Sequence, residues 1–228
     1  MSTSQDMPAT SSRLWRWIGG LGIVYSVLYF LGLLVLTGNQ PGIDASANKL
    51  ITYYKAHEGQ TMAAVFVVAA AMVLFAFFLS ALRRELRRNG GDGEQLSTAA
   101  AVGGAVYIGG FLVGLILQVA LLDAASHHIT SAARTLNVLS QDDWVPVVVG
   151  LSIVALSTGF AGLRGRVLPR WLAVASIALG LLALAGPLGG IAFLLTPLWT
   201  LAVGVVLARG PSATSVRPAA EAVAPAAA

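Results

Sequence analysis

The side chains best suited to chemistry are histidines and carboxylates that gather between long uncharged stretches of the chain. Together such groups can bind zinc and similar divalent ions, but their spacing argues against a site of this kind. His127 and His128 are adjacent, so on a helix they point about 100° apart, and no H-x-x-x-H or H-E-x-x-H spacing occurs. Asp142 and Asp143 stand where acids cap a following helix. The full group is His57, Glu58, Asp123, His127, His128, Asp142 and Asp143. We therefore predict no metal site, no catalytic residue and no cofactor-binding residue.

The uncharged stretches themselves hold no Asp, Glu, Lys, Arg or His. Proton-coupled pumps and transporters usually need ionisable groups at membrane depth, so this class is disfavoured. Hydroxyl side chains can bond back to their own helix, and we predict packing roles for Tyr25, Tyr29 and Tyr107. Gln118 lies about one turn from Asp123 and is expected to reach the membrane interface. The polar set comprises Ser26, Gln118, Ser152, Ser157, Thr158, Ser176, Thr196 and Thr200.

The elements that must position these residues follow from the lengths of the uncharged stretches. About 18 or more apolar residues can cross a hydrocarbon core of about 30 Å. The last stretch has 38 residues between Arg170 and Arg209; as one helix it would be about 57 Å long. A break at residues 186–190, Gly-Pro-Leu-Gly-Gly, divides it into two short spans. The five stretches are Trp17–Gln40, Gln60–Leu82, Gln95–Leu122, Trp144–Leu163 and Trp171–Ala208. They predict six membrane-spanning helices.

Composition supports this class of protein. Of the 228 residues, 57% are hydrophobic and 11% are charged, whereas a water-soluble domain carries roughly a quarter charged residues. The net charge of +4 is what membrane topology requires, so we predict no nucleic-acid partner. The absence of cysteine excludes disulfides and thiolate metal sites.

The distribution of positive charge predicts the orientation. Eleven of the 14 Lys and Arg residues fall on one side if the N-terminus is placed in the cytoplasm, as the positive-inside rule favours. Arg83, Arg84, Arg87 and Arg88 form the densest cluster; it could bind anionic lipid headgroups, although topology anchoring is a sufficient explanation. We expect a bacterial cytoplasmic membrane protein with both termini inside. Its parts are a tail over residues 1–12, a transmembrane domain over 13–209 and a disordered tail over 210–228.

Both long outer loops carry helical patterns. Residues 45–58 place apolar side chains on one face, with Asp44 as the expected cap and Gly59 as the expected end, and residues 129–139 do the same. Both predict short amphipathic helices on the outer surface. Segments 17–83 and 97–164 then share one order of elements and almost one length, which predicts a parallel repeat.

Small residues predict how the spans pack. Gly110 and Gly114 form a G-x-x-x-G pair that suits either an internal or a dimer contact, and their helix is expected to be the central, most buried one. Trp199 follows Pro197 by two residues. We expect it to fill the gap that a proline kink leaves, with lining of a cavity as the alternative.

The chain resembles a group of uncharacterised six-helix bacterial membrane proteins, a domain-of-unknown-function family. The resemblance rests on residues 50–54 (Leu-Ile-Thr-Tyr-Tyr) with His57, residues 82–87 (Leu-Arg-Arg-Glu-Leu-Arg) and residues 168–172 (Leu-Pro-Arg-Trp-Leu). It implies an all-α, six-span bundle with two short outer amphipathic helices, and it brings no substrate, cofactor or active site.

Three functions remain open. The leading one is a non-enzymatic accessory protein that contacts membrane lipids and binds a second copy or another membrane protein. The alternative is a permease-like carrier for a small neutral or apolar compound, which a polar cavity between the spans would favour. The third is an outer-face membrane enzyme, which would require Glu58, Asp123 and His127 to converge.

Overall fold

The computed structural model describes residues 10–37, 40–87, 92–165 and 168–209. Every regular element in these ranges is helical. The terminal tails predicted over 1–12 and 210–228 lie largely or wholly outside them. The elements are α1 (Thr10–Thr37), α2 (Ala47–Ala56), α3 (Glu58–Arg87), α4 (Asp92–Ser126), α5 (Thr130–Asp142), α6 (Trp144–Gly165), α7 (Arg170–Ala183), the 3-10 turn η1 (Gly186–Leu188) and α8 (Gly189–Arg209).

Four helices in the described ranges are long and apolar enough to cross a membrane. They correspond to α3, α4, α6 together with the preceding α5, and α8. Large apolar side chains also face outward, with Phe66 at 68%, Ile116 at 67% and Leu198 at 61% exposure. Water-soluble monomers rarely expose contiguous apolar surface of this kind, so the bundle fits a membrane protein.

The count of six spans is supported only in part. Two further apolar helical segments are Gly20–Leu34, which belongs to the 28-residue α1, and α7. With 14 residues, α7 is about 21 Å long, less than the ~30 Å of a hydrocarbon core. The reason is local: Pro169 precedes the helix and the Gly186–Leu188 turn follows it, as the predicted break at this position requires.

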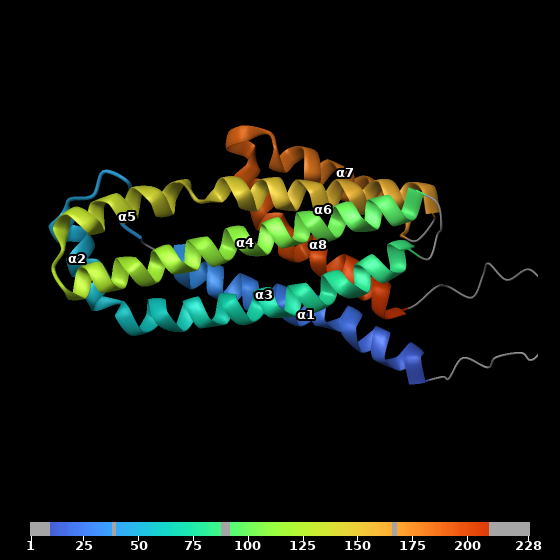
Figure 1. Ribbon diagram of the computed structural model, residues 1–228, viewed down its shortest axis with the longest axis horizontal. Coiled ribbons are helices and arrows are strands. Elements are labelled where there is room, and N and C mark those ends of the chain that lie inside the picture. Colours follow the sequence, from blue (N-terminus) through green and yellow to red (C-terminus); the bar gives the residue numbers. More distant parts are fainter. Residues whose placement is uncertain (1–9, 38–39, 88–91, 166–167, 210–228) are drawn as a thin grey trace, which may run out of the picture.

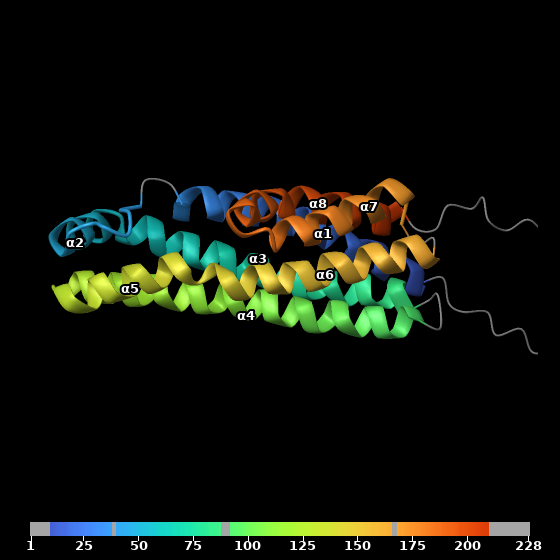
Figure 2. The same cartoon turned by 90° about the horizontal axis from the view of Figure 1, so that it is seen from above.

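The bundle has two chemically different ends (Figures 1 and 2). We call one the α2/α5 end, because α2 and α5 form it. The opposite end, the arginine end, collects the last turns of α3, α6 and α8 and the first turn of α7. It carries Arg83, Arg84, Arg87, Arg164, Arg170 and Arg209.

The predicted amphipathic helices are confirmed, and the structure shows where their apolar faces point. In α2, Leu50, Ile51 and Tyr54 are buried. Leu50 and Tyr54 pack against the end of α4 at Leu121 and Ala125, and Ile51 packs with Ala124 of α4 and Ala133 of α5. The predicted cap was wrong: the Ser46 hydroxyl, not the Asp44 carboxylate, accepts the Lys49 backbone N–H at 3.4 Å. Gly59 does not end this helix either. It lies within α3, because a single residue, His57, separates the end of α2 from the start of α3.

The G-x-x-x-G pair serves an internal contact with α6. A Cβ added at Gly110 would lie 2.9 Å from Val147 Cγ2 and 3.0 Å from its backbone nitrogen. On the facing helix, a Cβ at Gly150 would meet the backbone of Tyr107 and lie 2.7 Å from the Gly103 carbonyl oxygen. These missing side chains let the backbones of α4 and α6 approach.

The prediction that this glycine-rich helix is the most buried was wrong. Of the four long apolar helices, α4 is the least buried and the segment containing α6 the most buried. The reason is that α6 packs between α4 and α7. By contrast, α4 presents Leu112, Val113 and Ile116 outward.

Helix pairing agrees with the predicted repeat in order but not in every contact. The long helices α1 and α3 pack against each other, and α2 lies between them in the sequence. In the same way α4 packs against α6, with α5 between them in the sequence. However, α2 lies mainly on α4 and α5, whereas α5 lies on α4 of its own unit. Superposition of segments 17–83 and 97–164 stays a prediction.

Trp199 joins α7 to α8. Its indole N–H donates to the Ser176 hydroxyl at 2.8 Å, and that hydroxyl donates to the Leu172 carbonyl at 2.7 Å. The ring is 6% exposed and packs in the core. The expected packing role of Trp199 therefore fits better than the cavity-lining alternative.

Candidate ligand-binding cavity

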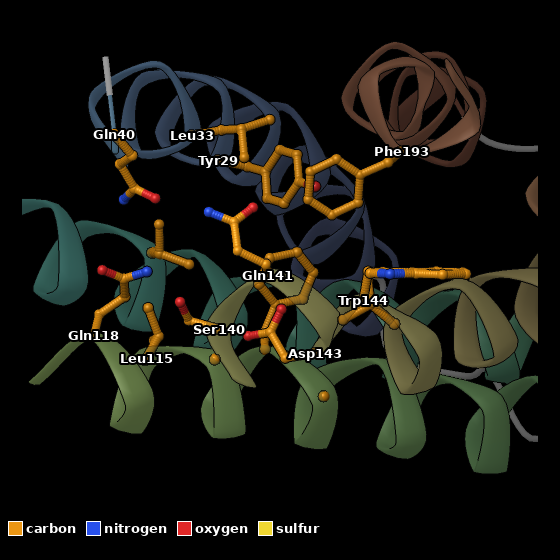
Figure 3. A pocket seen from close by; sticks show the side chains of 15 residues that line it. Tyr29, Leu33, Gln40, Leu115, Gln118, Ser140, Gln141, Asp143, Trp144 and Phe193 are labelled. Carbon is orange, nitrogen blue, oxygen red and sulfur yellow. The ribbon is translucent and has the colours of Figure 1, made fainter. Parts of the chain in front are cut away.

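A cavity of about 230 Å³ lies inside the bundle, toward the α2/α5 end (Figure 3). Its walls come from α1, α3, α4 and the start of α8, together with the α5–α6 junction. The lining residues are Tyr29, Leu33, Gln40, Val68, Gly110, Phe111, Gly114, Leu115, Gln118, Ser140, Gln141, Asp143, Trp144, Val147 and Phe193. A shallow surface hollow beside α2 shares Gln40 with the cavity, so the two adjoin.

Two features of the backbone create this space. The α7–η1–α8 hairpin stops well short of the α2/α5 end (Figure 1), and Phe193 in the first part of α8 therefore reaches the cavity. In addition, α5 and α6 are separate helices that meet at Asp143. Pro146 explains that break, because its ring would clash with the carbonyl of Asp142 in a continuous helix, whereas proline is tolerated in a first turn.

Aromatic rings form one wall. The ring centroids of Tyr29 and Phe111 are 5.5 Å apart, those of Tyr29 and Phe193 are 5.7 Å apart, and those of Phe111 and Phe193 are 5.7 Å apart. The three rings come from α1, α4 and α8, so each holds the others in place through preferred aromatic packing. The wall is rigid and apolar.

The same cavity contains buried polar atoms that lack hydrogen-bond partners. Among the described residues, the unsatisfied buried side-chain atoms are the Tyr29 hydroxyl and the Gln118 carbonyl oxygen Oε1, and both residues line the cavity. The Tyr29 hydroxyl lies near that of Tyr107, which already hydrogen-bonds the Tyr25 hydroxyl, so the Gln118 oxygen is the clearer of the two cases. Leaving such an atom unsatisfied costs about 1–3 kcal/mol, so an ordered water or another donor is expected near Gln118.

One carboxyl group also lines the cavity. Asp143 is half-buried at the α5–α6 junction and rests against Gly114, where an added Cβ would meet its Oδ2 atom. Burial raises the pKa of the Asp143 carboxyl to about 6; the neighbouring Asp142 adds to this, while a backbone hydrogen bond opposes it. The group is therefore mostly ionised at neutral pH but is easily protonated.

An aromatic layer closes the cavity toward the arginine end. The Tyr25 and Tyr107 hydroxyls hydrogen-bond at 3.0 Å, and Phe75 packs against both rings at centroid distances of 4.9 and 5.0 Å. Tyr25, Tyr29 and Tyr107 are all fully buried. The predicted packing role holds for Tyr25 and Tyr107, whereas Tyr29 both packs and lines the cavity.

The seven candidate histidines and acids that lie between the uncharged stretches do not come together in one site. His127 Nδ1 bonds its own turn at the Asp123 carbonyl oxygen, 2.9 Å away, while His128 Nε2 bonds the Lys55 ammonium at 3.0 Å. Within the described ranges, no three His, Cys, Asp or Glu side chains are placed to share a metal ion. Only Asp143 of the original seven lines the cavity.

Sequence reasoning missed most of this site. Gln118 was expected at the membrane interface, yet its amide points into the cavity (Figure 3). Phe111 and Phe193 gave no signal, because aromatic residues are ordinary in apolar helices. One usable sign was Pro146 placed soon after an acidic pair, which marks a helix break with a carboxylate beside it.

The fold and the cavity together define a class: a helical bundle with apolar helices of membrane-spanning length and an internal cavity of ligand size. Comparisons with protein-family models, curated proteins and solved structures find no match. The function must therefore be argued from the cavity itself.

Proposed function

We propose that this chain is a permease-like carrier that takes up a small organic molecule in the cavity between its helices. The observation that carries the proposal is the cavity itself, which combines the Tyr29, Phe111 and Phe193 rings with the polar side chains of Gln118, Ser140 and Asp143. Ligand pockets combine apolar walls with a few placed polar groups, and this cavity has both. Its volume is about 230 Å³, below the roughly 300–1,000 Å³ of drug-sized sites, so the ligand is small.

The proposal includes the topology. Arginines at the arginine end support a cytoplasmic location for that end, with six spans and both termini inside a bacterial cytoplasmic membrane. The cavity then opens toward the outside. The Tyr25–Tyr107 layer closes it on the cytoplasmic side, as in a carrier open to one side of the membrane.

Uptake into proteoliposomes tests the carrier function. Glycerol, acetamide and choline chloride, applied separately, represent a polyol, an amide and an organic cation. We expect the protein to accelerate uptake of at least one of them, as followed by stopped-flow light scattering. Ser140→Trp should abolish that acceleration by filling the cavity wall, whereas Leu139→Trp, on the neighbouring half-exposed position, should preserve it.

The result also separates the carrier from the accessory protein. Uptake equal to that of empty liposomes for all three solutes, and for every compound that is found to bind in the cavity, would contradict the carrier. Ligand binding to the cavity without uptake would instead favour the accessory, partner-binding function.

A further inference from the structure

The charge and the aromatic surfaces of the cavity define the chemistry of its ligand more narrowly. Among the described lining residues, Asp143 is the one charged side chain, and none is Lys, Arg or His. Within the described ranges Asp143 forms no ion pair; the ion pair found there joins Arg87 to Glu94 at the opposite end. The cavity therefore has a negative charge without a protein counter-ion.

A capping role accounts for only part of this arrangement. A carboxylate just before α6 is favoured by the positive end of the helix dipole, and this explains why an acid stands there. It does not explain why the carboxylate shares a cavity with three mutually packed aromatic rings and the Gln118 side chain.

The aromatic wall adds a second attraction for positive charge. Aromatic faces attract ammonium groups within about 6 Å of the ring centroid. Tyr29, Phe111 and Phe193 lie in contact with one another, and in Figure 3 Asp143 lies on the lower side of the hollow with Tyr29 and Phe193 on the upper side. A cation in the hollow would lie between a carboxylate and aromatic rings.

The cavity also favours a cation that can donate hydrogen bonds. The Asp143 carboxylate is an acceptor, and the uncharged side chains of Gln40, Ser140 and Gln141 line the same space. A quaternary ammonium has no N–H to offer, whereas a protonated amine can donate to the Asp143 carboxylate.

We propose that the cavity binds a small protonated amine with an aromatic or apolar body, its ammonium group held by Asp143 and its body packed against Tyr29, Phe111 and Phe193. This inference rests on the proposed function and deepens it, because it names the charge and the donor groups of the ligand. It replaces the neutral or apolar compound of the alternative carrier hypothesis with a cation.

Three probes of similar size and different charge test it: 2-phenylethylamine, 2-phenylethanol and phenylacetate. Binding to the purified full chain at pH 7.5 is measured by calorimetry. We expect the amine to bind at least roughly tenfold more tightly than the alcohol, since an added cation–carboxylate and cation–π contact is worth that much. Phenylacetate should bind least well. Equal affinity for amine and alcohol would overturn the amine assignment while leaving a neutral-ligand carrier intact.

Variants separate the contributions of the charge and the rings. Asp143→Asn should reduce amine affinity to about that of the alcohol, a loss of roughly tenfold, and leave alcohol affinity within about twofold. Phe193→Ala should weaken both ligands. An amine affinity unchanged in Asp143→Asn would overturn the proposal. Should Asp143→Asn fail to fold, the comparison of the amine, the alcohol and phenylacetate in the wild-type protein decides whether the cavity prefers positive charge.

Discussion

At the scale of single residues, Asp143 connects the stability of the bundle with its chemistry. Ionised carboxyl groups are costly to bury, and this one has Asp142 beside it on the same junction. The titratable group facing it across the cavity is Tyr29 of α1; α3, α4 and α8 contribute uncharged lining residues only. The charge therefore has a cost for folding that the binding of a cation would offset.

This cost predicts a pH-dependent effect of Asp143→Asn. The pKa of the carboxyl is raised from 3.8 to about 6 in the folded protein, so the folded state holds a proton more tightly than the unfolded state. The proton on Asp143 therefore stabilises the folded state. This contribution is complete below pH 3.8 and is lost as the pH rises through about 6. Asparagine does not ionise and also caps helices well.

The melting temperature of the Asn variant relative to the wild type should therefore rise between about pH 4 and pH 7 and then level off. Thermal unfolding in detergent across pH 4.5–8 measures it. The comparison at the lowest pH is the internal control, because there the wild-type carboxyl is largely protonated. A difference between the two proteins that stays constant over the whole range would mean that burial does not hold this carboxyl in the protonated form.

At the scale of the helices, α4 and α6 approach closely through glycines, and adjacent positions on α4 offer a matched test. A Cβ at Gly110 would press on the Val147 backbone, whereas a Cβ at Gly109 would have nothing within 4 Å. Gly110→Ala should lower the unfolding free energy by about 1–3 kcal/mol because it overpacks the contact. Gly109→Ala should be neutral or stabilising by up to about 1 kcal/mol.

Unfolding by a denaturing detergent in mixed micelles measures both variants. Similar effects of the two substitutions, or a larger loss for Gly109→Ala, would show that the face of α4 toward α6 has been assigned to the wrong glycine.

The sequence predicted the helices well because the signals are local. Run lengths mark the long helices, the apolar spacing in 45–58 and 129–139 marks α2 and α5 to within a few residues, and the Gly-Pro pair marks the turn before α8. Burial was predicted less well. Glycine content suggested that α4 is central, but glycine marks a close approach to one neighbour and not burial on all sides: α4 packs closely on α6, while Leu112, Val113 and Ile116 on the same helix face outward.

The cavity was beyond local signals because it is made of distant segments. Tyr29, Gln118 and Phe193 are far apart in the chain, and each has an ordinary explanation in its own helix. What brings them together is the difference in length between the α7–α8 hairpin and the helices around it (Figure 1). The sequence identified Asp143 as a capping acid. That it also lines the cavity depends on the packing of α4 against α6, which no local pattern in the sequence shows.

At the scale of the whole molecule, the central claim is that the cavity is reached by water-soluble molecules from the α2/α5 end. The chain has no cysteine, so each introduced thiol is a unique label. Gln118 and Ile116 are two residues apart on α4, but Gln118 lines the cavity whereas Ile116 is 67% exposed on the outer, apolar surface. Lipid around Ile116 should suppress formation of the reactive thiolate there, since a buried charge is costly.

The most direct test is labelling of Gln118→Cys, in membranes, by a small thiol reagent that cannot cross the bilayer, applied from the side of the α2/α5 end. Asn48→Cys on the exposed part of α2 is the positive control and Ile116→Cys the negative one. The account predicts that Gln118→Cys reacts, that Ile116→Cys does not, and that 2-phenylethylamine slows the reaction at position 118 but not at position 48. A Gln118→Cys thiol as unreactive as Ile116→Cys, while Asn48→Cys reacts, would contradict it.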